Sequence, residues 1–280
     1  MTYGVRSSVA PLRRAALRRP AVTGDWAEAG WRRPDTELLL AQHEAFAEKL
    51  TELGVSVEVA PATEGEVDAV FAYDSVFVIG GGTVVFRSAK PCRQGEAAKL
   101  AAALEGFGVP TMASLTAPSV MDGGDVCWIG DNVAVAGRGY RTNQAAHEEL
   151  RALLAAEGQQ LFSYDMPHDQ GPAHVLHLMS GISPVADDLA VVFEPIMPVA
   201  LLQELAAREI TTIPVDPDEY ATLGSNVLAV HPGVVVIFEG NPKTAAALAK
   251  HGVEVHEVAA SELAKGDGGP TCLTRPLWRA

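Results

Sequence analysis

The feature that most constrains the fold is a recurring order of segments: strand, turn, strand, helix and strand, with a period of about 50 residues. Helices with apolar residues at helical spacing are expected at 35–53, 96–107, 143–157, 198–208 and 242–251. About four or five copies fit the 280 residues, and a period of this size is typical of a ring or a stacked array. Identity between the copies is weak, and no Ser- or Pro-rich linker separates them. We therefore expect one α/β domain over residues 1–280.

Short apolar segments between the helices predict the strands. Residues 55–59 alternate strictly, and residues 73–79 and 83–87 flank Gly80-Gly81-Gly82 as a hairpin would. Further strands are expected at 119–121, 126–129, 133–136, 174–178, 189–193, 227–230, 233–239, 253–258 and 272–277. The first 24 residues hold five arginines and no acid, a pattern that transit peptides share. Because they contain no apolar core region, we favour an ordinary first strand and turn.

The composition excludes several classes of function. A net charge of −14 argues against a nucleic-acid partner and favours a cationic one. No apolar run is long enough to span a membrane. Cys92, Cys127 and Cys272 form no Cys-x-x-Cys pair, so neither a disulfide framework nor a thiolate zinc site is indicated. A reducing compartment, the cytoplasm, is the simplest expectation.

Glycine and proline crowd the residues before the last cysteine, in the segment Asp267-Gly-Gly-Pro-Thr-Cys272. The glycine pair allows a close backbone approach, and Pro270 stiffens the turn before the thiol. A buried structural cysteine is the commoner role for a lone cysteine. The alternative is a nucleophile presented by a rigid turn, and it gains weight from two candidate partners upstream, Asp122 and His177.

Both of these partners lie in ambiguous segments. Asp122-Gly-Gly-Asp125 is either a hairpin turn or a carboxylate that a ligand approaches closely. No third ligand at suitable spacing supports a metal site there. His174 and His177 point to opposite faces if they lie on a strand, so that only one of them faces the core or a site. A hydrogen-bonded core histidine remains the ordinary alternative.

Two arginines have functional potential. Arg93 follows a proline and a cysteine, and Arg141 opens the segment Arg-Thr-Asn before a helix. Either could hold a carboxylate through two parallel hydrogen bonds, although a solvated surface charge is the default. Gly80-Gly81-Gly82 lacks the lysine and the helix of a phosphate-binding loop.

Taken together, these motifs resemble the dimethylarginine dimethylaminohydrolases. That family belongs to the pentein superfamily of guanidino-group-modifying enzymes, with the arginine deiminases and the amidinotransferases. The resemblance runs from about Tyr3 to Leu277 and rests on 73–78, 122–125, 141–143, 175–178 and 267–272. It implies a five-bladed α/β propeller of ββαβ units around a central substrate channel, in agreement with the period.

The resemblance also implies roles for the candidate residues. Cys272 would be the nucleophile, His177 the general acid and base, and Asp122 the carboxylate that holds the guanidinium. Asp74 would line the site. The substrate carboxylate would bind Arg93 and Arg141.

The chain departs from the family pattern at Ile79-Gly80, where the family often has an acidic pair whose second member contacts the guanidinium. Asp125 or Asp267 could supply the missing substrate-binding carboxylate. If no other acid fills this gap, we expect the loss to favour a bulkier or less polar N-substituted guanidine over arginine.

The implied activity is hydrolysis of a guanidino C–N bond in a small cationic substrate, through a covalent Cys thiouronium intermediate. The product would be a ureido compound such as citrulline, together with an amine or ammonia, and no metal or organic cofactor is expected. Two alternatives stay open: an amidinotransferase that uses the same site, and a non-catalytic propeller that binds a guanidino ligand. The sequence also leaves open the exact substrate and the oligomeric state, including a homodimer.

Overall fold

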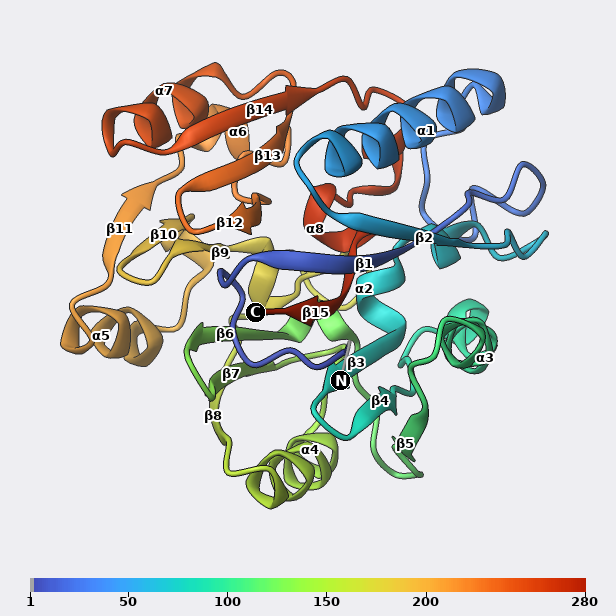
Figure 1. Ribbon diagram of the computed structural model, residues 1–280, viewed down its shortest axis with the longest axis horizontal. Coiled ribbons are helices and arrows are strands. Elements are labelled where there is room, and N and C mark those ends of the chain that lie inside the picture. Colours follow the sequence, from blue (N-terminus) through green and yellow to red (C-terminus); the bar gives the residue numbers. More distant parts are fainter. Residues whose placement is uncertain (1–2) are drawn as a thin grey trace.

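The computed structural model describes residues 3–280, and in this range the strands form five three-stranded sheets around a common centre (Figure 1). In each sheet the inner strand pairs antiparallel with the middle one, and the middle strand pairs parallel with the outer one. From inside to outside, four of the sheets are β3 (Val76–Ile79), β4 (Gly82–Val85) and β5 (Thr111–Ser114); β6 (Val126–Gly130), β7 (Val133–Arg138) and β8 (Gln160–Asp165); β9 (Ile182–Ala186), β10 (Leu189–Val192) and β11 (Thr211–Pro214); and β12 (Leu228–His231), β13 (Val234–Phe238) and β14 (Glu254–Val258).

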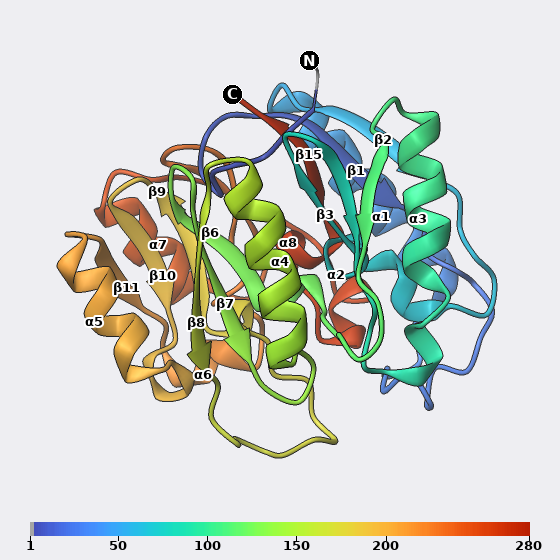
Figure 2. The ribbon, with the colours of Figure 1, turned by 90° about the horizontal axis from the view of Figure 1, so that it is seen from below.

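The fifth sheet joins the two ends of the chain. Its inner strand β15 (Arg275–Arg279) pairs antiparallel with β1 (Leu12–Arg18), which pairs parallel with β2 (Ser56–Ala60). The Arg-rich start of the chain therefore forms a strand, as predicted. This pairing closes the ring and leaves both termini on one face of the molecule (Figure 2).

A helix lies outside each sheet and connects the middle strand to the outer one (Figure 1). Parallel strands need such a crossover, because a tight turn cannot reverse the chain direction twice. The five helices are α1 (Thr36–Glu52), α3 (Glu96–Gly106), α4 (Gln144–Ala156), α5 (Val199–Ala207) and α7 (Pro242–Lys250). The predicted helices are confirmed to within two residues at each end. Asp35 caps α1 by accepting hydrogen bonds from the N–H groups of Glu37 and Leu38.

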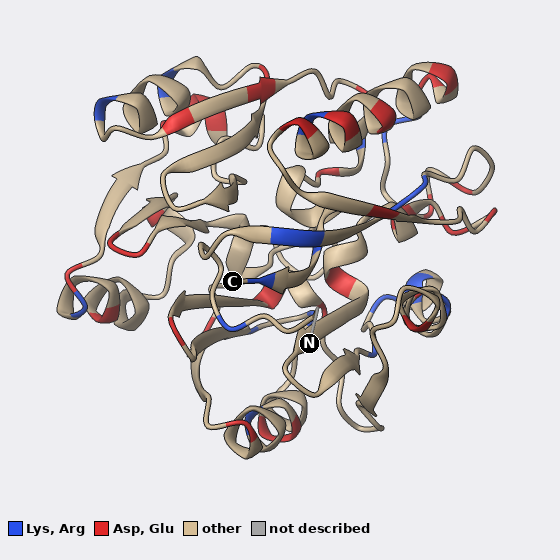
Figure 3. Cartoon of the chain, viewed as in Figure 1, with Lys and Arg blue, Asp and Glu red and all other residues tan. Residues whose placement is uncertain are grey.

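Three short α-helices also occur in the described chain: α2 (Ala72–Ser75), α6 (Pro217–Tyr220) and α8 (Pro270–Leu273). The apolar faces of the long helices pack on their sheets; Leu39, Phe46 and Leu50 of α1, for example, are buried. Charged residues lie mostly on the outer helices, with a basic stretch on β1 and β15 near the centre (Figure 3). No helix in residues 3–280 is both long and apolar enough to cross a membrane.

Four of the predicted strands are wrong in part or as a whole. Residues 73–75 belong to α2, residues 119–121 have no strand partner, and 174–178 leads into a 3₁₀ helix, Leu178–Ser180. The last strand begins at Arg275, because residues 270–273 are helical. In these segments side chains form the backbone hydrogen bonds that a neighbouring strand would otherwise form. The N–H of Leu178, for example, donates to Oδ1 of Asp125. Apolar alternation alone does not reveal such partners.

Candidate active site

The connecting segments of the ring enclose a cavity of about 630 Å³. Five of the predicted site residues line it, and each comes from a different connecting segment: Asp74, Arg93, Arg141, His177 and Cys272. His174 and Asp267 also lie on its wall. Asp74, His177 and Cys272 each precede an inner strand, whereas Arg93 and Arg141 each lie between a middle strand and its helix. Residues that are up to about 200 positions apart are thus brought into one pocket.

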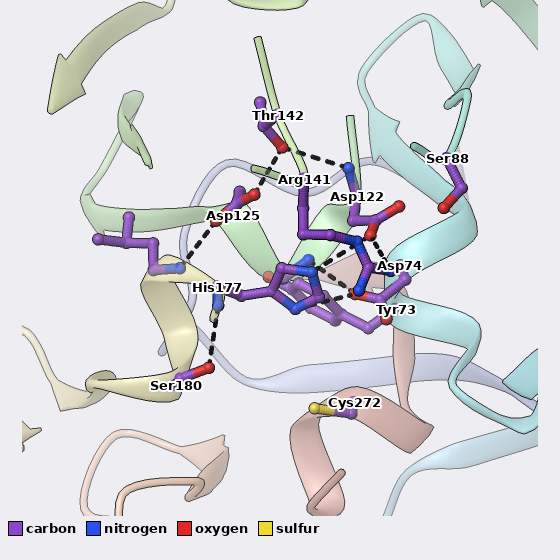
Figure 4. A network of polar contacts seen from close by, with 12 residues as sticks. Tyr73, Asp74, Ser88, Asp122, Asp125, Arg141, Thr142, His177, Ser180 and Cys272 are labelled. Carbon is purple, nitrogen blue, oxygen red and sulfur yellow. Dashed lines mark hydrogen bonds and ion pairs between the residues drawn. The ribbon is translucent and has the colours of Figure 1, made fainter. Parts of the chain in front are cut away.

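Asp122 lies behind the cavity wall and is 1% exposed. Its Oδ2 atom accepts a hydrogen bond from Nε2 of His177 at 3.3 Å and pairs with Nη2 of Arg141 at 2.6 Å (Figure 4). Burial by itself raises the pKa of this carboxyl, but the hydrogen bond from His177 and the charge of Arg141 bring the pKa below its usual range. Asp122 is therefore ionised at neutral pH.

His177 stands between two carboxylates. Its Nδ1 lies 3.9 Å from Oδ1 of Asp74, on the side away from Asp122. Burial lowers the pKa of the imidazole, but Asp74 and Asp122 outweigh burial and raise the pKa above 6.5. This shift favours the protonated, proton-donating form of His177. A Cβ atom at Gly124 would lie only 2.4 Å from Nδ1 of His177, which explains the glycine beside the acidic pair.

Asp125 is buried behind the wall rather than on it, and it organises the histidine segment. Its Oδ1 accepts from the N–H of Leu178 at 2.9 Å, and its Oδ2 accepts from Oγ1 of Thr142 at 2.6 Å. The N–H of Asp122 in turn donates to the Thr142 hydroxyl at 3.3 Å. Burial raises the pKa of Asp125 to about 6. This network ties the Asp122, Arg141 and His177 segments together.

Arg93 is also held by acids. Its Nη1 donates to Oδ2 of Asp74 at 2.7 Å, and its Nε donates to Oε2 of Glu96 at 2.9 Å. The other Asp74 oxygen accepts from the N–H of Gly124 at 2.8 Å. Burial raises the pKa of Glu96 to about 7, against the opposing charge of Arg93. Glu96 was not among the residues expected in the site, although it lies only three residues after Arg93.

Cys272 lies on α8, across the cavity from His177 (Figure 4). Its Sγ accepts a hydrogen bond from Nδ2 of Asn226 at 3.2 Å, and Oδ1 of Asn226 accepts from the N–H of Thr271 at 3.0 Å. Burial and, to a smaller extent, Asp74 raise the pKa of the thiol to about 11, while Asn226 acts in the opposite direction. The free protein therefore carries a neutral thiol at pH 7. No pattern in the sequence singled out Asn226.

The glycine pair before Cys272 is required for packing. A Cβ atom at Gly268 would lie 2.3 Å from the ring of Phe71, and one at Gly269 would lie 2.5 Å from the amide carbon of Asn226. The other cysteines have no place in the cavity: Cys127 is buried in a core cluster, and Cys92 is half-buried before α3. Within residues 3–280, no group of three or more His, Cys, Asp or Glu side chains is arranged to hold a metal ion.

The expectation about Ile79-Gly80 is corrected by the structure. Ile79 is a core residue, and Gly80 lies in the β3–β4 turn, where its N–H donates to Oε2 of Glu157 at 2.8 Å. Neither residue lines the cavity. The four-residue strand β3 carries the chain about 13 Å away from its cavity end. An acid at position 80 therefore has no route to a ligand in the cavity.

A five-bladed ring of this kind, with a cysteine, a histidine and buried acids around a central cavity, defines a class of α/β propeller enzymes. The arginine deiminase family model matches residues 199–279. A dimethylarginine dimethylaminohydrolase from Streptomyces coelicolor is 30% identical over 94% of this chain and 96% of its own length. The chain belongs to the same superfamily, the penteins, which includes the dimethylarginine dimethylaminohydrolases, the arginine deiminases and the amidinotransferases.

More distant relatives belong to the same group of enzymes. An arginine deiminase from Latilactobacillus sakei is 29% identical over 57% of this chain, which spans only 47% of that enzyme. Among solved structures, a dimethylarginine dimethylaminohydrolase from Pseudomonas aeruginosa in complex with citrulline superposes with a TM-score of 0.80. The superposition covers 95% of this chain and 99% of that one, at 22% identity. This likeness confirms the predicted five-bladed fold.

Proposed function

We propose that the protein hydrolyses a C–N bond in the guanidino group of a small cationic amino acid, such as arginine or an N-methylated arginine. The observation that carries the proposal is the arrangement of Cys272 and His177 on one cavity, with the carboxylates of Asp74 and Asp122 on either side of the imidazole. The first residue supplies a nucleophile, the second a proton donor, and the acids supply the negative charge that a guanidinium needs.

Asp122 is the proposed ligand of the substrate guanidinium, but its carboxylate is already paired with Arg141. The 2.6 Å pair between Arg141 and Asp122 is itself a guanidinium–carboxylate contact. A substrate guanidinium that reaches Asp122 has to displace Arg141. The freed arginine then becomes available for the substrate carboxylate, the role that the family resemblance gives it. Arg93 is held by two carboxylates, so we assign it mainly to fixing Asp74.

The bound cation also activates the nucleophile. With a pKa of about 11, Cys272 is a thiol in the empty site. A guanidinium placed between Asp74 and Cys272 supplies the positive charge that lowers a thiol pKa. The thiolate therefore forms in the presence of substrate, which limits side reactions of the free enzyme.

The reaction then needs two proton transfers by the same histidine. The Cys272 thiolate attacks the central guanidino carbon and forms a tetrahedral adduct. Protonated His177 donates its proton to the departing nitrogen, the C–N bond breaks, and a thiouronium remains on sulfur. Neutral His177 next takes a proton from water, whose oxygen attacks the same carbon. Loss of the thiolate releases the ureido product.

Product analysis tests this proposal. The purified protein is incubated separately with arginine, monomethylarginine and dimethylarginine, and the products are measured by mass spectrometry beside a Cys272→Ser control. We expect citrulline with ammonia or a methylamine from at least one substrate, and none from the control. Transfer of the amidino group to an added amine would identify an amidinotransferase. Binding without any product would identify a guanidino-ligand-binding protein.

A further inference from the structure

A second, much smaller cavity lies on the propeller axis, on the side of the chain termini. Its volume is about 20 Å³, enough for one water molecule or one monatomic ion. The wall comes from the inner strands and from the segment that enters β1, with Ser7, Trp128, Leu228, Arg275 and Arg279 among its residues. It does not share His177 or Cys272 with the active-site cavity.

Two arginines of β15 dominate this site. Arg275 and Arg279 are four residues apart on one strand, so they share a face, and they are only 1% and 6% exposed. Arg275 donates to the carbonyl oxygens of Tyr73 and Val76, and its guanidinium lies 3.9 Å from the centre of the Tyr73 ring. Arg279 donates to the carbonyl oxygens of Ala10 and Ala229.

These contacts satisfy hydrogen bonds but give neither arginine an ion-pair partner. Among residues 3–280, no carboxylate forms an ion pair with either arginine, and the central basic stretch in Figure 3 includes this strand. Burial lowers the pKa of Arg279 to about 9, which still leaves it charged at pH 7. Two buried like charges without a counter-ion are costly, so an anion that neutralises one of them stabilises the fold.

The unpartnered atoms of the wall are all donors. Nε of Arg275, Nε of Arg279 and Nε1 of Trp128 are buried N–H groups with no hydrogen-bond partner. The hydroxyl oxygens of Ser7 and Ser8 each accept from a backbone N–H, which leaves their protons free to donate. A water molecule would bring two protons of its own into this donor-rich wall, whereas a halide only accepts hydrogen bonds and carries a negative charge.

We propose that this cavity is a structural binding site for one monatomic anion, chloride under ordinary conditions, held by Arg275, Arg279 and Trp128. The anion offsets the positive charge of Arg275 and Arg279 at the centre of the ring and thereby stabilises the closed ring. The site does not depend on the proposed hydrolytic function, and its occupancy requires no substrate.

Crystallography with bromide gives the direct test. Crystals of the full chain are grown without chloride, soaked in sodium bromide and measured at the bromine absorption edge. We expect an anomalous peak in the cavity, within hydrogen-bond reach of the Arg279 and Trp128 side chains. Ordinary water density there, without an anomalous signal in crystals that bind bromide at their surface, would overturn the proposal.

Thermal unfolding provides the test in solution. The melting temperature is compared in sodium chloride and sodium gluconate at equal ionic strength, because gluconate is too large for the cavity. Above its dissociation constant, each tenfold rise in chloride should raise the melting temperature by about 3 °C through binding to the folded state. Equal melting temperatures in the two salts would show that any bromide peak reflects binding at crystal concentration only, and would also overturn the proposal.

A matched pair of variants assigns the effect to the cavity. Arg279→Met should lose the chloride-specific shift, whereas Arg33→Met, which removes an exposed arginine, should keep it. A full chloride shift in Arg279→Met would contradict the assignment. If Arg279→Met does not fold, the wild-type comparison of the two salts still decides the question.

Discussion

Arg141 places Nη2 2.6 Å from Oδ2 of Asp122, on the same oxygen that accepts a hydrogen bond from His177. The free site thus holds an internal guanidinium where the proposed substrate guanidinium has to bind. Substrate binding then exchanges ion-pair partners. Asp122 pairs with the substrate guanidinium in place of Arg141, and Arg141 binds the carboxylate at the other end of the substrate. This relationship leads to the first prediction.

Replacing Arg141 should show whether this residue binds the carboxylate end of the substrate. Arg141→Met removes the proposed carboxylate ligand, and the loss of a charge-assisted hydrogen bond should raise KM for arginine-type substrates about tenfold to a hundredfold. A decarboxylated substrate should show no such increase, since it has nothing for Arg141 to bind. Arg138→Met, at an exposed ion pair with Asp165, serves as the control. An equal increase in KM for both substrates would contradict the exchange.

Cys272→Ser should abolish turnover and leave the fold unchanged. Serine is a far weaker nucleophile at neutral pH and would need a stronger base to activate it. Steady-state assays and circular dichroism measure the two effects. Cys92→Ser is the matched control, and it should retain activity, because Cys92 lies outside the active-site cavity. Near-normal turnover by Cys272→Ser would end the covalent proposal.

His177→Ala should slow both halves of the reaction, because one imidazole donates a proton and later accepts one. If hydrolysis of the intermediate is slowed more than its formation, the thiouronium accumulates on Cys272. Intact-protein mass spectrometry after a short exposure to substrate detects this added mass. An unchanged rate would move the proton transfers to another group, with His174 on the same cavity wall as the first candidate.

The thiol of the free protein should titrate at high pH. Burial raises its pKa to about 11, so the rate of alkylation by iodoacetamide should be low at pH 7 and rise up to about pH 11 as the thiolate fraction grows. Asn226→Ala removes a donor that lowers the pKa, so the profile should move further upward. A substrate analogue with a guanidinium should move it downward. An apparent thiol pKa below 8 in the free protein would contradict this account.

Gly80→Asp should leave the order of preference among arginine, monomethylarginine and dimethylarginine unchanged. The turn that holds Gly80 faces Glu157 and not the cavity. The added side chain should lower stability, because its Cβ atom would lie 2.8 Å from Oε2 of Glu157. Values of kcat/KM for the three substrates and a melting curve provide the measurements. A changed preference would restore the sequence-based expectation that an acid here contacts the substrate.

Local sequence patterns determined most of the architecture. The five long helices were predictable because each has its own apolar periodicity and end signals, and their even spacing indicated a ring of repeated units. Asp122, His177 and Cys272 were also identifiable, since glycines and a proline mark segments where the backbone makes close approaches.

Contacts between distant segments were decided by the tertiary structure alone. Asn226 reaches Cys272 from 46 positions away, and no local pattern marks it. The pairing of Arg141 with Asp122 and the neutral state of the Cys272 thiol depend on burial and on nearby charges, which exist only after the blades close. The burial of Arg275 and Arg279 side by side could not be foreseen either, because in the sequence they are only two arginines on a short strand. Electrostatic properties depend on distances through space, and these are set by the closure of the ring.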